Sequence, residues 1–147
     1  MKKLALLFLF LLVFSKLSAQ VNSQMRYHSD ERTYYVWNEE KQDYDFKENE
    51  FEHSIIEIRE IGSRTNGYVA ITLIDDGKVR LYHGSIKDYK VDDNNEATWS
   101  IFSKNKRGKL IYNEKKQTFS FSFESDEKRY LKIFIFKLKE GTVAELD

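Results

Sequence analysis

The chain has 147 residues, with 24 basic and 24 acidic side chains, three histidines, no cysteine and no proline. Without cysteine it can form neither a disulfide framework nor a thiolate metal site. Its formal net charge of zero differs from that of strongly cationic proteins that bind nucleic acids, so we expect no nucleic-acid partner. Apolar residues make up 41% of the chain and aromatic residues 15%, which excludes an intrinsically disordered protein.

Residues 1–19 have the pattern of a secretory signal peptide. Lys2 and Lys3 precede an unbroken apolar run at residues 4–14, and a more polar segment then ends in Ala19. The run is too short to span a bilayer, although an uncleaved membrane anchor is the alternative interpretation. We therefore expect cleavage after Ala19, a secreted or periplasmic protein, and no transmembrane segment in the mature chain. The leader and the Lys- and Asn-rich mature chain resemble those of exported Gram-negative bacterial proteins.

Residues 20–147 are expected to form a single domain. Removing the three lysines of the leader leaves 21 basic and 24 acidic side chains, a net charge of −3. A domain of this size buries enough apolar surface to fold without disulfides. The core alone must therefore stabilise it.

Apolar and polar residues alternate with a period of two along the mature chain, which predicts strands rather than helices. Residues 20–32 are polar, and we expect them to be loosely structured. The predicted strands then follow in chain order at residues 33–37, 43–47, 51–59, 68–74, 78–84, 86–91, 97–103, 109–113, 117–124 and 129–138.

The register of the hairpin at residues 68–84 can be predicted by asking which pairing gathers the apolar side chains on one face. A three-residue loop places Ile71 opposite Leu81 and turns His83 toward the apolar face. It also puts Gly77 at a left-handed turn position, which glycine adopts without strain. We therefore predict the three-residue loop over a two-residue one.

The same test gives the next two hairpins. A four-residue loop at residues 105–108 places Ile101 opposite Tyr112, and a turn at residues 114–117 places Tyr112 opposite Phe119. Consecutive hairpins make a meander. We predict an all-β, antiparallel meander of eight to ten short strands, closed as an up-and-down β-barrel or a strongly curled sheet, with a two-sheet β-sandwich as the alternative.

The strongest functional pattern is an aromatic stripe on one face of the predicted sheet. Such a stripe fills a core by default, but a small barrel can also hold one ligand among such side chains. The residues that would line a site for a small apolar ligand are His83, Trp99, Tyr112, Phe119, Phe121 and Phe123.

Basic residues gather around two successive predicted turns. They are Lys104, Lys106, Arg107, Lys109, Lys115 and Lys116. They could contact an anionic partner, but charged turns also serve solubility alone. We treat them as a candidate surface patch.

Catalytic and metal-binding patterns are absent from the sequence. The three histidines have no zinc-site spacing, so we expect no metal and no cofactor. Residues 92–96 resemble a calcium loop but lack its glycine and its final glutamate, and we interpret them as a turn. Glu48, Glu50 and Glu52 are interpreted as a solvated strand edge.

Three functional hypotheses remain from the sequence. The first is an exported, non-catalytic binding module that takes a small apolar ligand in a β-barrel. The second is a protein-interaction or inhibitor domain of the cell envelope, acting on an envelope protein partner. The third is a hydrolase whose site the sequence does not reveal, because no nucleophile or phosphate-binding motif is present.

Overall fold

The computed structural model describes residues 21–75, 77–125, 128–139 and 144–145, so the expected signal peptide lies outside the described residues. These ranges form ten strands and contain no helix. The strands are β1 (Val21–Asn38), β2 (Asp43–Glu50), β3 (Ser54–Gly62), β4 (Gly67–Asp75), β5 (Lys78–Val91), β6 (Ala97–Ser103), β7 (Lys106–Asn113), β8 (Thr118–Ser125), β9 (Tyr130–Leu138) and β10 (Ala144–Glu145).

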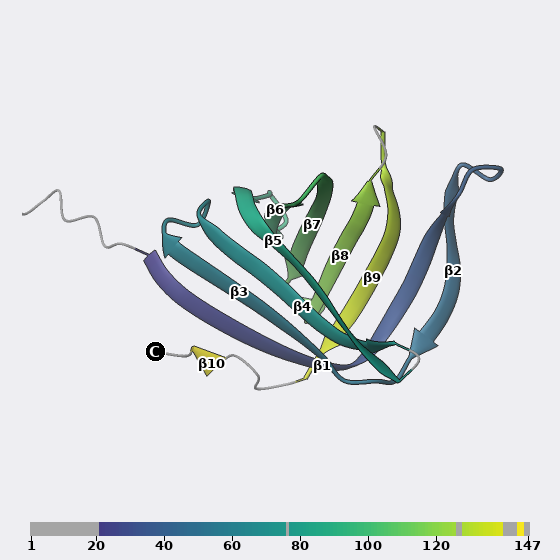
Figure 1. The fold of residues 1–147 in the computed structure, drawn as a ribbon, viewed down its shortest axis with the longest axis horizontal. Coiled ribbons are helices and arrows are strands. Elements are labelled where there is room, and N and C mark those ends of the chain that lie inside the picture. Colours follow the sequence, from purple (N-terminus) through teal and green to yellow (C-terminus); the bar gives the residue numbers. More distant parts are fainter. Residues whose placement is uncertain (1–20, 76, 126–127, 140–143, 146–147) are drawn as a thin grey trace, which may run out of the picture.

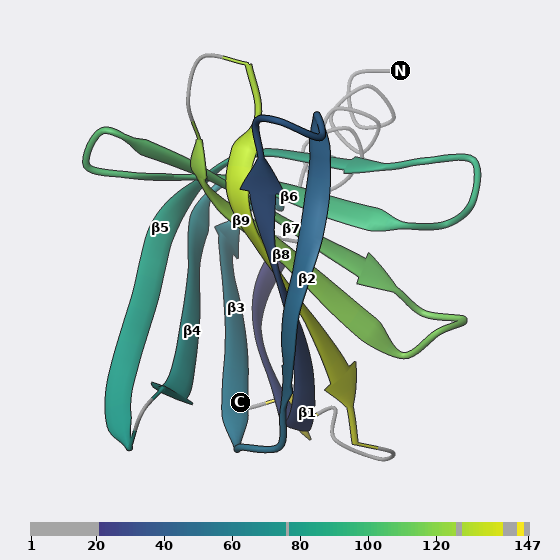
Figure 2. The same ribbon diagram turned by 90° about the vertical axis from the view of Figure 1, so that its right-hand side faces the viewer.

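Eight of the strands close into an antiparallel barrel (Figure 1, Figure 2). From β3 to β9 each strand pairs with the next along the chain. β1 completes the ring by pairing with β3 on one edge and β9 on the other. The predicted up-and-down barrel is thereby confirmed over the two-sheet sandwich.

β1 is an 18-residue strand, so the prediction that residues 20–32 are loosely structured is wrong. Residues 21–29 of β1 pair with β3, and residues 29–36 pair with β9. Met25 and Tyr27 pack against the core, while Arg26 between them and Gln24 and His28 on either side are polar. The average composition of residues 20–32 is polar, but alternate side chains of the strand are buried, so the average does not reveal the strand.

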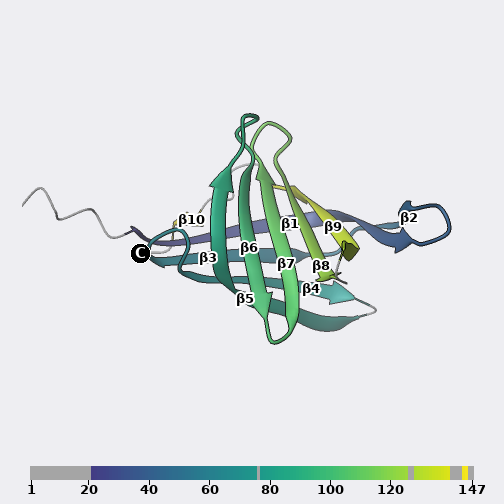
Figure 3. The same ribbon diagram turned by 90° about the horizontal axis from the view of Figure 1, so that it is seen from above.

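β2 pairs only with β1 among the described strands. The hairpin of β1 and β2 therefore extends away from the barrel, as Figure 3 shows. β2 is additional to the closed ring, and its second edge lies outside the barrel.

Every strand of the ring contributes at least one side chain to a single apolar core. The buried members are Tyr27, Ile56, Ile58, Val69, Ile71, Leu73, Ile86, Trp99, Ile101, Leu110, Phe119, Phe121, Phe123, Phe134, Phe136 and Leu138. The alternation predicted for Phe119, Phe121 and Phe123 is confirmed, because all three face inward.

The register predicted for the hairpin of β4 and β5 is wrong. Asp75 pairs with Lys78, which leaves a two-residue loop, and Ile71 lies opposite Tyr82. Leu81 therefore faces outward and is 59% exposed. The prediction assumed that aliphatic residues pair with one another, whereas the barrel places the Tyr82 ring inside against two rings of β8. Gly77 does adopt the left-handed conformation, with φ of 69°.

The hairpin of β6 and β7 also differs from its predicted register. Ser103 pairs with Lys106, so the loop has two residues, and Ile101 lies opposite Gly108. A shift by an even number of residues keeps each side chain on its predicted face. The next hairpin is confirmed, because Tyr112 lies opposite Phe119.

Candidate functional site

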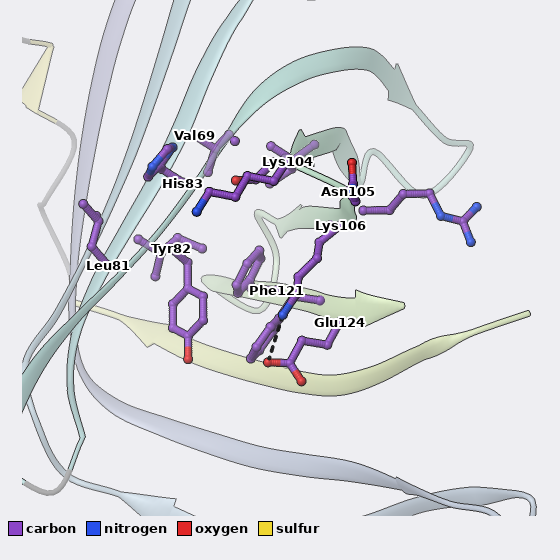
Figure 4. Close-up of a pocket in the computed structure, with 16 residues that line it drawn as sticks. Val69, Leu81, Tyr82, His83, Lys104, Asn105, Lys106, Phe121 and Glu124 are labelled. Carbon is purple, nitrogen blue, oxygen red and sulfur yellow. Dashed lines mark ion pairs between the residues drawn. The ribbon is translucent and has the colours of Figure 1, made fainter. Parts of the chain in front are cut away.

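A hollow of about 440 Å³ opens at the end of the barrel that carries the β6–β7 turn (Figure 4). This volume falls within the range of small-molecule sites. Its floor consists of apolar core residues from β4, β6 and β8, none more than 6% exposed: Val69, Ile71, Ile101, Phe121 and Phe123. The hollow is therefore a recess above a packed core rather than a channel through the barrel.

The hollow exists because the hairpin of β6 and β7 is too short to cover all of β5. β5 pairs with β6 only from Ser85 onward, whereas residues 78–84 pair with β4 alone among the described strands. Gly84 and Gly108 both line the hollow and add no side chain to fill it. At Gly84 a Cβ atom would lie 2.8 Å from the Ile101 side chain, so the backbones approach closely there.

Tyr82 forms one wall of the hollow (Figure 4). Its ring centroid lies 4.7 Å from that of Phe123 and 5.8 Å from that of Phe121. Tilted aromatic contacts of this kind hold the ring in place. The wall and floor thus both present aromatic rings to any occupant.

The rim of the hollow is cationic. Lys104 and Lys106 reach over it from the β6–β7 turn, as Figure 4 shows. The Glu124 carboxylate lies 3.9 Å from the Lys106 amine and 2.9 Å from the Lys132 amine. Burial opposes the charge on Lys132, but the hydrogen bond and the charge of Glu124 outweigh it and raise the pKa of Lys132. Lys104 has no ion-pair partner among the described residues, so the rim keeps an excess of positive charge.

The structure separates the six predicted ligand-lining residues into two groups. His83, Phe121 and Phe123 line the hollow. Trp99, Tyr112 and Phe119 do not, and pack toward the opposite end of the barrel, where the Tyr112 and Phe119 rings stack with centroids 4.9 Å apart.

His83 does not face the apolar interior as its predicted register implied. It is exposed, and it alternates along β5 with the inward-facing Tyr82 and Gly84. The one-residue difference in register between the predicted and observed hairpins turns its side chain away from the core, although the residue still borders the hollow at the edge of β5.

The end of the barrel opposite the hollow is closed by aromatic rings around a buried carboxylate. Glu60 is 2% exposed, and its two oxygens accept hydrogen bonds from Trp99 Nε1 at 3.2 Å and Ser23 Oγ at 3.1 Å. Burial raises the pKa of Tyr27 to about 12, with further contributions from Tyr112 and Glu60. These contacts fill the interior, so this end is core.

The six basic residues of the candidate patch do not lie together. Lys104, Lys106 and Arg107 line the hollow at the β6–β7 turn. Lys115 and Lys116 belong to the β7–β8 turn at the other end of β7 (Figure 3), and Lys109 lies within β7. Turns that are adjacent along a meander lie at opposite ends of their shared strand, which separates the two groups.

A buried arginine was not foreseen from the sequence. Arg32 is 1% exposed, and its guanidinium donates hydrogen bonds to the Glu50 carboxylate, to Ser54 Oγ at 3.0 Å and to the Ile74 carbonyl. Burial raises the pKa of Glu50, although the hydrogen bond and charge of Arg32 oppose this shift. The interpretation of Glu50 as part of a solvated edge is therefore wrong, since its side chain is 15% exposed and faces Arg32.

The segment at residues 92–96 forms the turn that its composition predicts. Asp92 Oδ1 accepts hydrogen bonds from the backbone N–H groups of Asn94 and Glu96, each at 2.9 Å. Across the described ranges, no group of three or more histidine, cysteine, aspartate or glutamate side chains is arranged to hold a metal ion.

No model of a known protein family, no curated protein and no solved structure matches the chain. The part of the chain that the structure describes contains no helix long and apolar enough to cross a membrane. The class of the protein is therefore defined by its fold alone, as a closed eight-stranded antiparallel barrel with an additional strand.

Proposed function

We propose that the chain is a non-catalytic binding module that takes a small ligand with an apolar body and an anionic end in the hollow at the β6–β7 turn. The observation that carries this proposal is the buried aromatic and aliphatic floor of a recess of about 440 Å³. Removal of an apolar ligand from water by such a floor stabilises the complex in proportion to the area buried.

The charge of the rim supports an anionic end for the ligand. Among the residues that the structure describes, Lys104, Lys106 and Arg107 line the hollow together with one carboxylate, that of Glu124. A carboxylate or sulfate group placed at the rim would contact ammonium groups while its apolar body rests on the floor. A cationic ligand of the same shape would be repelled.

The test compares two probes of equal length and opposite charge. We expect isothermal titration to show that decanoate binds with one site per chain, and that decylamine binds at least about tenfold more weakly, a difference of about 1.4 kcal/mol. Equal affinities of the two probes would contradict the anionic preference. Absence of binding by both would contradict the ligand site itself.

Charge-reversing substitutions locate the site. Lys104→Glu is expected to weaken decanoate binding by roughly threefold to tenfold, as expected for one partly exposed ion pair. The matched control is Lys115→Glu, which makes the same change of charge at the opposite end of the barrel. Glu124→Gln removes the one carboxylate that lines the hollow among the described residues and should strengthen binding. Equal effects of the two lysine substitutions would place the probe elsewhere.

We also propose export to the periplasm or beyond the cell, on the pattern of residues 1–19. Amino-terminal sequencing of the protein from the envelope fraction of a Gram-negative host should begin at Gln20. An intact Met1 would contradict a cleaved signal peptide.

A specific observation also favours the protein-interaction hypothesis. Residues 78–83 of β5 have one edge with no strand partner among those described, and on the outer face of this segment Val79 is 72% exposed and Leu81 59%. An unpaired edge of this kind is a template for strand addition. Val79 is not among the residues that line the hollow. Crosslinking to a protein in envelope extracts that is lost in Val79→Lys, with decanoate binding unchanged, would favour a protein partner.

A further inference from the structure

Two of the three histidines meet on the outer surface of the barrel, away from the hollow. His28 lies on β1, and His53 lies in the connection between β2 and β3. His28 Nδ1 and His53 Nε2 are 3.2 Å apart, and the two ring centroids are 5.2 Å apart. Their positions are 25 residues apart in the sequence, so no spacing rule reveals the pair.

An aspartate contacts the His53 ring at the nitrogen that does not face His28. His53 Nδ1 lies 2.8 Å from Asp30 Oδ1, and the other oxygen of Asp30 pairs with the Lys139 ammonium. When Nδ1 donates its proton to the carboxylate, Nε2 of neutral His53 carries the lone pair. This is the arrangement by which carboxylates orient metal-binding histidines in proteins.

A β-bulge puts the carboxylate in that position. The pairing of β1 with β9 shifts between Ser29 and Glu31, which leaves Asp30 as the extra residue. Ser29 is fully buried, and its hydroxyl donates a hydrogen bond to the Glu31 carbonyl at 2.7 Å, which fixes the bulge. Bulges commonly re-aim side chains at functional sites.

The distance between the two nitrogens matches that of a metal chelate. Two imidazole nitrogens bound at about 2.0–2.1 Å to one tetrahedral ion would lie about 3.3 Å apart. The observed 3.2 Å, which is also the length of a hydrogen bond between the two rings, is therefore already close to the separation that chelation requires. We propose that His28 Nδ1 and His53 Nε2 bind one divalent transition-metal ion, with Asp30 orienting the His53 ring through its contact with Nδ1 and water completing the coordination.

The ligand chemistry selects the class of metal. Imidazole nitrogens suit Zn²⁺, Ni²⁺ and Cu²⁺, whereas Mg²⁺ and Ca²⁺ require oxygen ligands. Asp30 contacts the far nitrogen of His53, so the protein supplies two direct ligands, which agrees with the lack of any three-ligand group among the described residues. When the metal binds His28 Nδ1, the proton on that nitrogen moves through solvent to Nε2 of the same ring. Neutral His28 therefore changes tautomer and releases no proton overall.

The test is isothermal titration of ZnCl₂ into the purified protein in a buffer that does not chelate metal. We expect one saturable site per chain. His28→Ala or His53→Ala should each weaken binding at least about tenfold, and Asp30→Asn by about tenfold, as for other carboxylates behind metal-bound histidines. The matched control is His83→Ala, because His83 is the remaining histidine, exposed and on β5. That variant should bind Zn²⁺ as the wild type does.

A second readout separates metal binding from folding. Electron paramagnetic resonance of one equivalent of Cu²⁺ should show two bound nitrogens in the wild type and one in His53→Gln, which changes only an exposed connection. Zn²⁺ binding that survives both His28→Ala and His53→Ala, a site that depends on His83, or no saturable binding would each overturn the proposal. Decanoate binding at the hollow is independent of all three outcomes.

Discussion

Arg32 carries a full charge inside the barrel. The sequence does not predict its burial, because the β-bulge at Asp30 shifts which residues of β1 face inward. Tyr27 and Ser29 are buried before the bulge at Asp30, whereas Arg32 is buried after it. The extra residue changes the inward-facing set from odd to even numbers. A strict alternation of period two across residues 27–32 would therefore place Arg32 outside.

We expect Arg32→Met to destabilise the protein by about 3 kcal/mol. The substitution leaves the Glu50 carboxylate without its counter-charge, and removal of one partner of a buried pair costs about 3–5 kcal/mol. The matched control is Arg26→Met, whose partner Glu57 and own side chain are 25% and 39% exposed, and which should cost less than about 1 kcal/mol. Urea unfolding measures both. Equal costs would show that Arg32 contributes no more than a surface pair.

At the scale of the strands, a register prediction succeeds when the inward-facing side chains of the two paired strands are similar in size. The hairpin of β7 and β8 was predicted correctly because Tyr112 and Phe119 are both large, inward-facing rings. The hairpin of β4 and β5 was not, because the interior there is shared between the Tyr82 ring and the bare backbone of Gly84. Predicting the register by placing apolar side chains of similar size opposite one another therefore fails where a large residue and a glycine occupy successive inward positions of one strand.

The turn between β3 and β4 offers a test of backbone strain. Gly67 has φ of 135°, and a Cβ atom added there would lie 1.9 Å from the Arg59 carbonyl oxygen. We expect Gly67→Ala to cost roughly 2–3 kcal/mol in the free energy of unfolding.

The same turn contains the control. Gly62 has φ of 75° but no heavy atom within 4 Å of an added Cβ, so Gly62→Ala should cost only about 1 kcal/mol for its left-handed conformation. Thermal unfolding of the two variants separates steric contact from conformation. If both substitutions cost the same, the contact with the Arg59 carbonyl has no energetic effect.

For the whole molecule, the sequence is sufficient to predict the barrel but not its hollow. The barrel follows from successive hairpins and from the apolar faces of strands such as β8. The hollow depends on a two-residue β6–β7 loop and on β5 extending past β6, and both are outcomes of register. The aromatic stripe could therefore be recognised, but not divided into a filled end and an open one.

The division of the barrel interior into a filled end and an open end predicts opposite effects on stability and ligand affinity for two phenylalanines of β8. Phe119 is fully buried, with its ring centroid 4.8 Å from that of Tyr27, so Phe119→Ala should cost about 3–5 kcal/mol in stability. Its decanoate affinity, measured on the folded protein, should stay within about twofold of wild type, a difference of about 0.4 kcal/mol. Phe121 forms part of the floor of the hollow.

Phe121→Ala should therefore change decanoate affinity by about tenfold or more, because it deepens the recess and removes an aromatic contact. Its stability cost should be smaller than that of Phe119→Ala, since the space it leaves opens into the hollow rather than forming a sealed cavity. Urea unfolding and calorimetric titration of the two variants give both quantities. Equal stability costs with unchanged affinity in both variants would mean that the whole interior is core, and that any ligand or partner binds on the outside of the barrel.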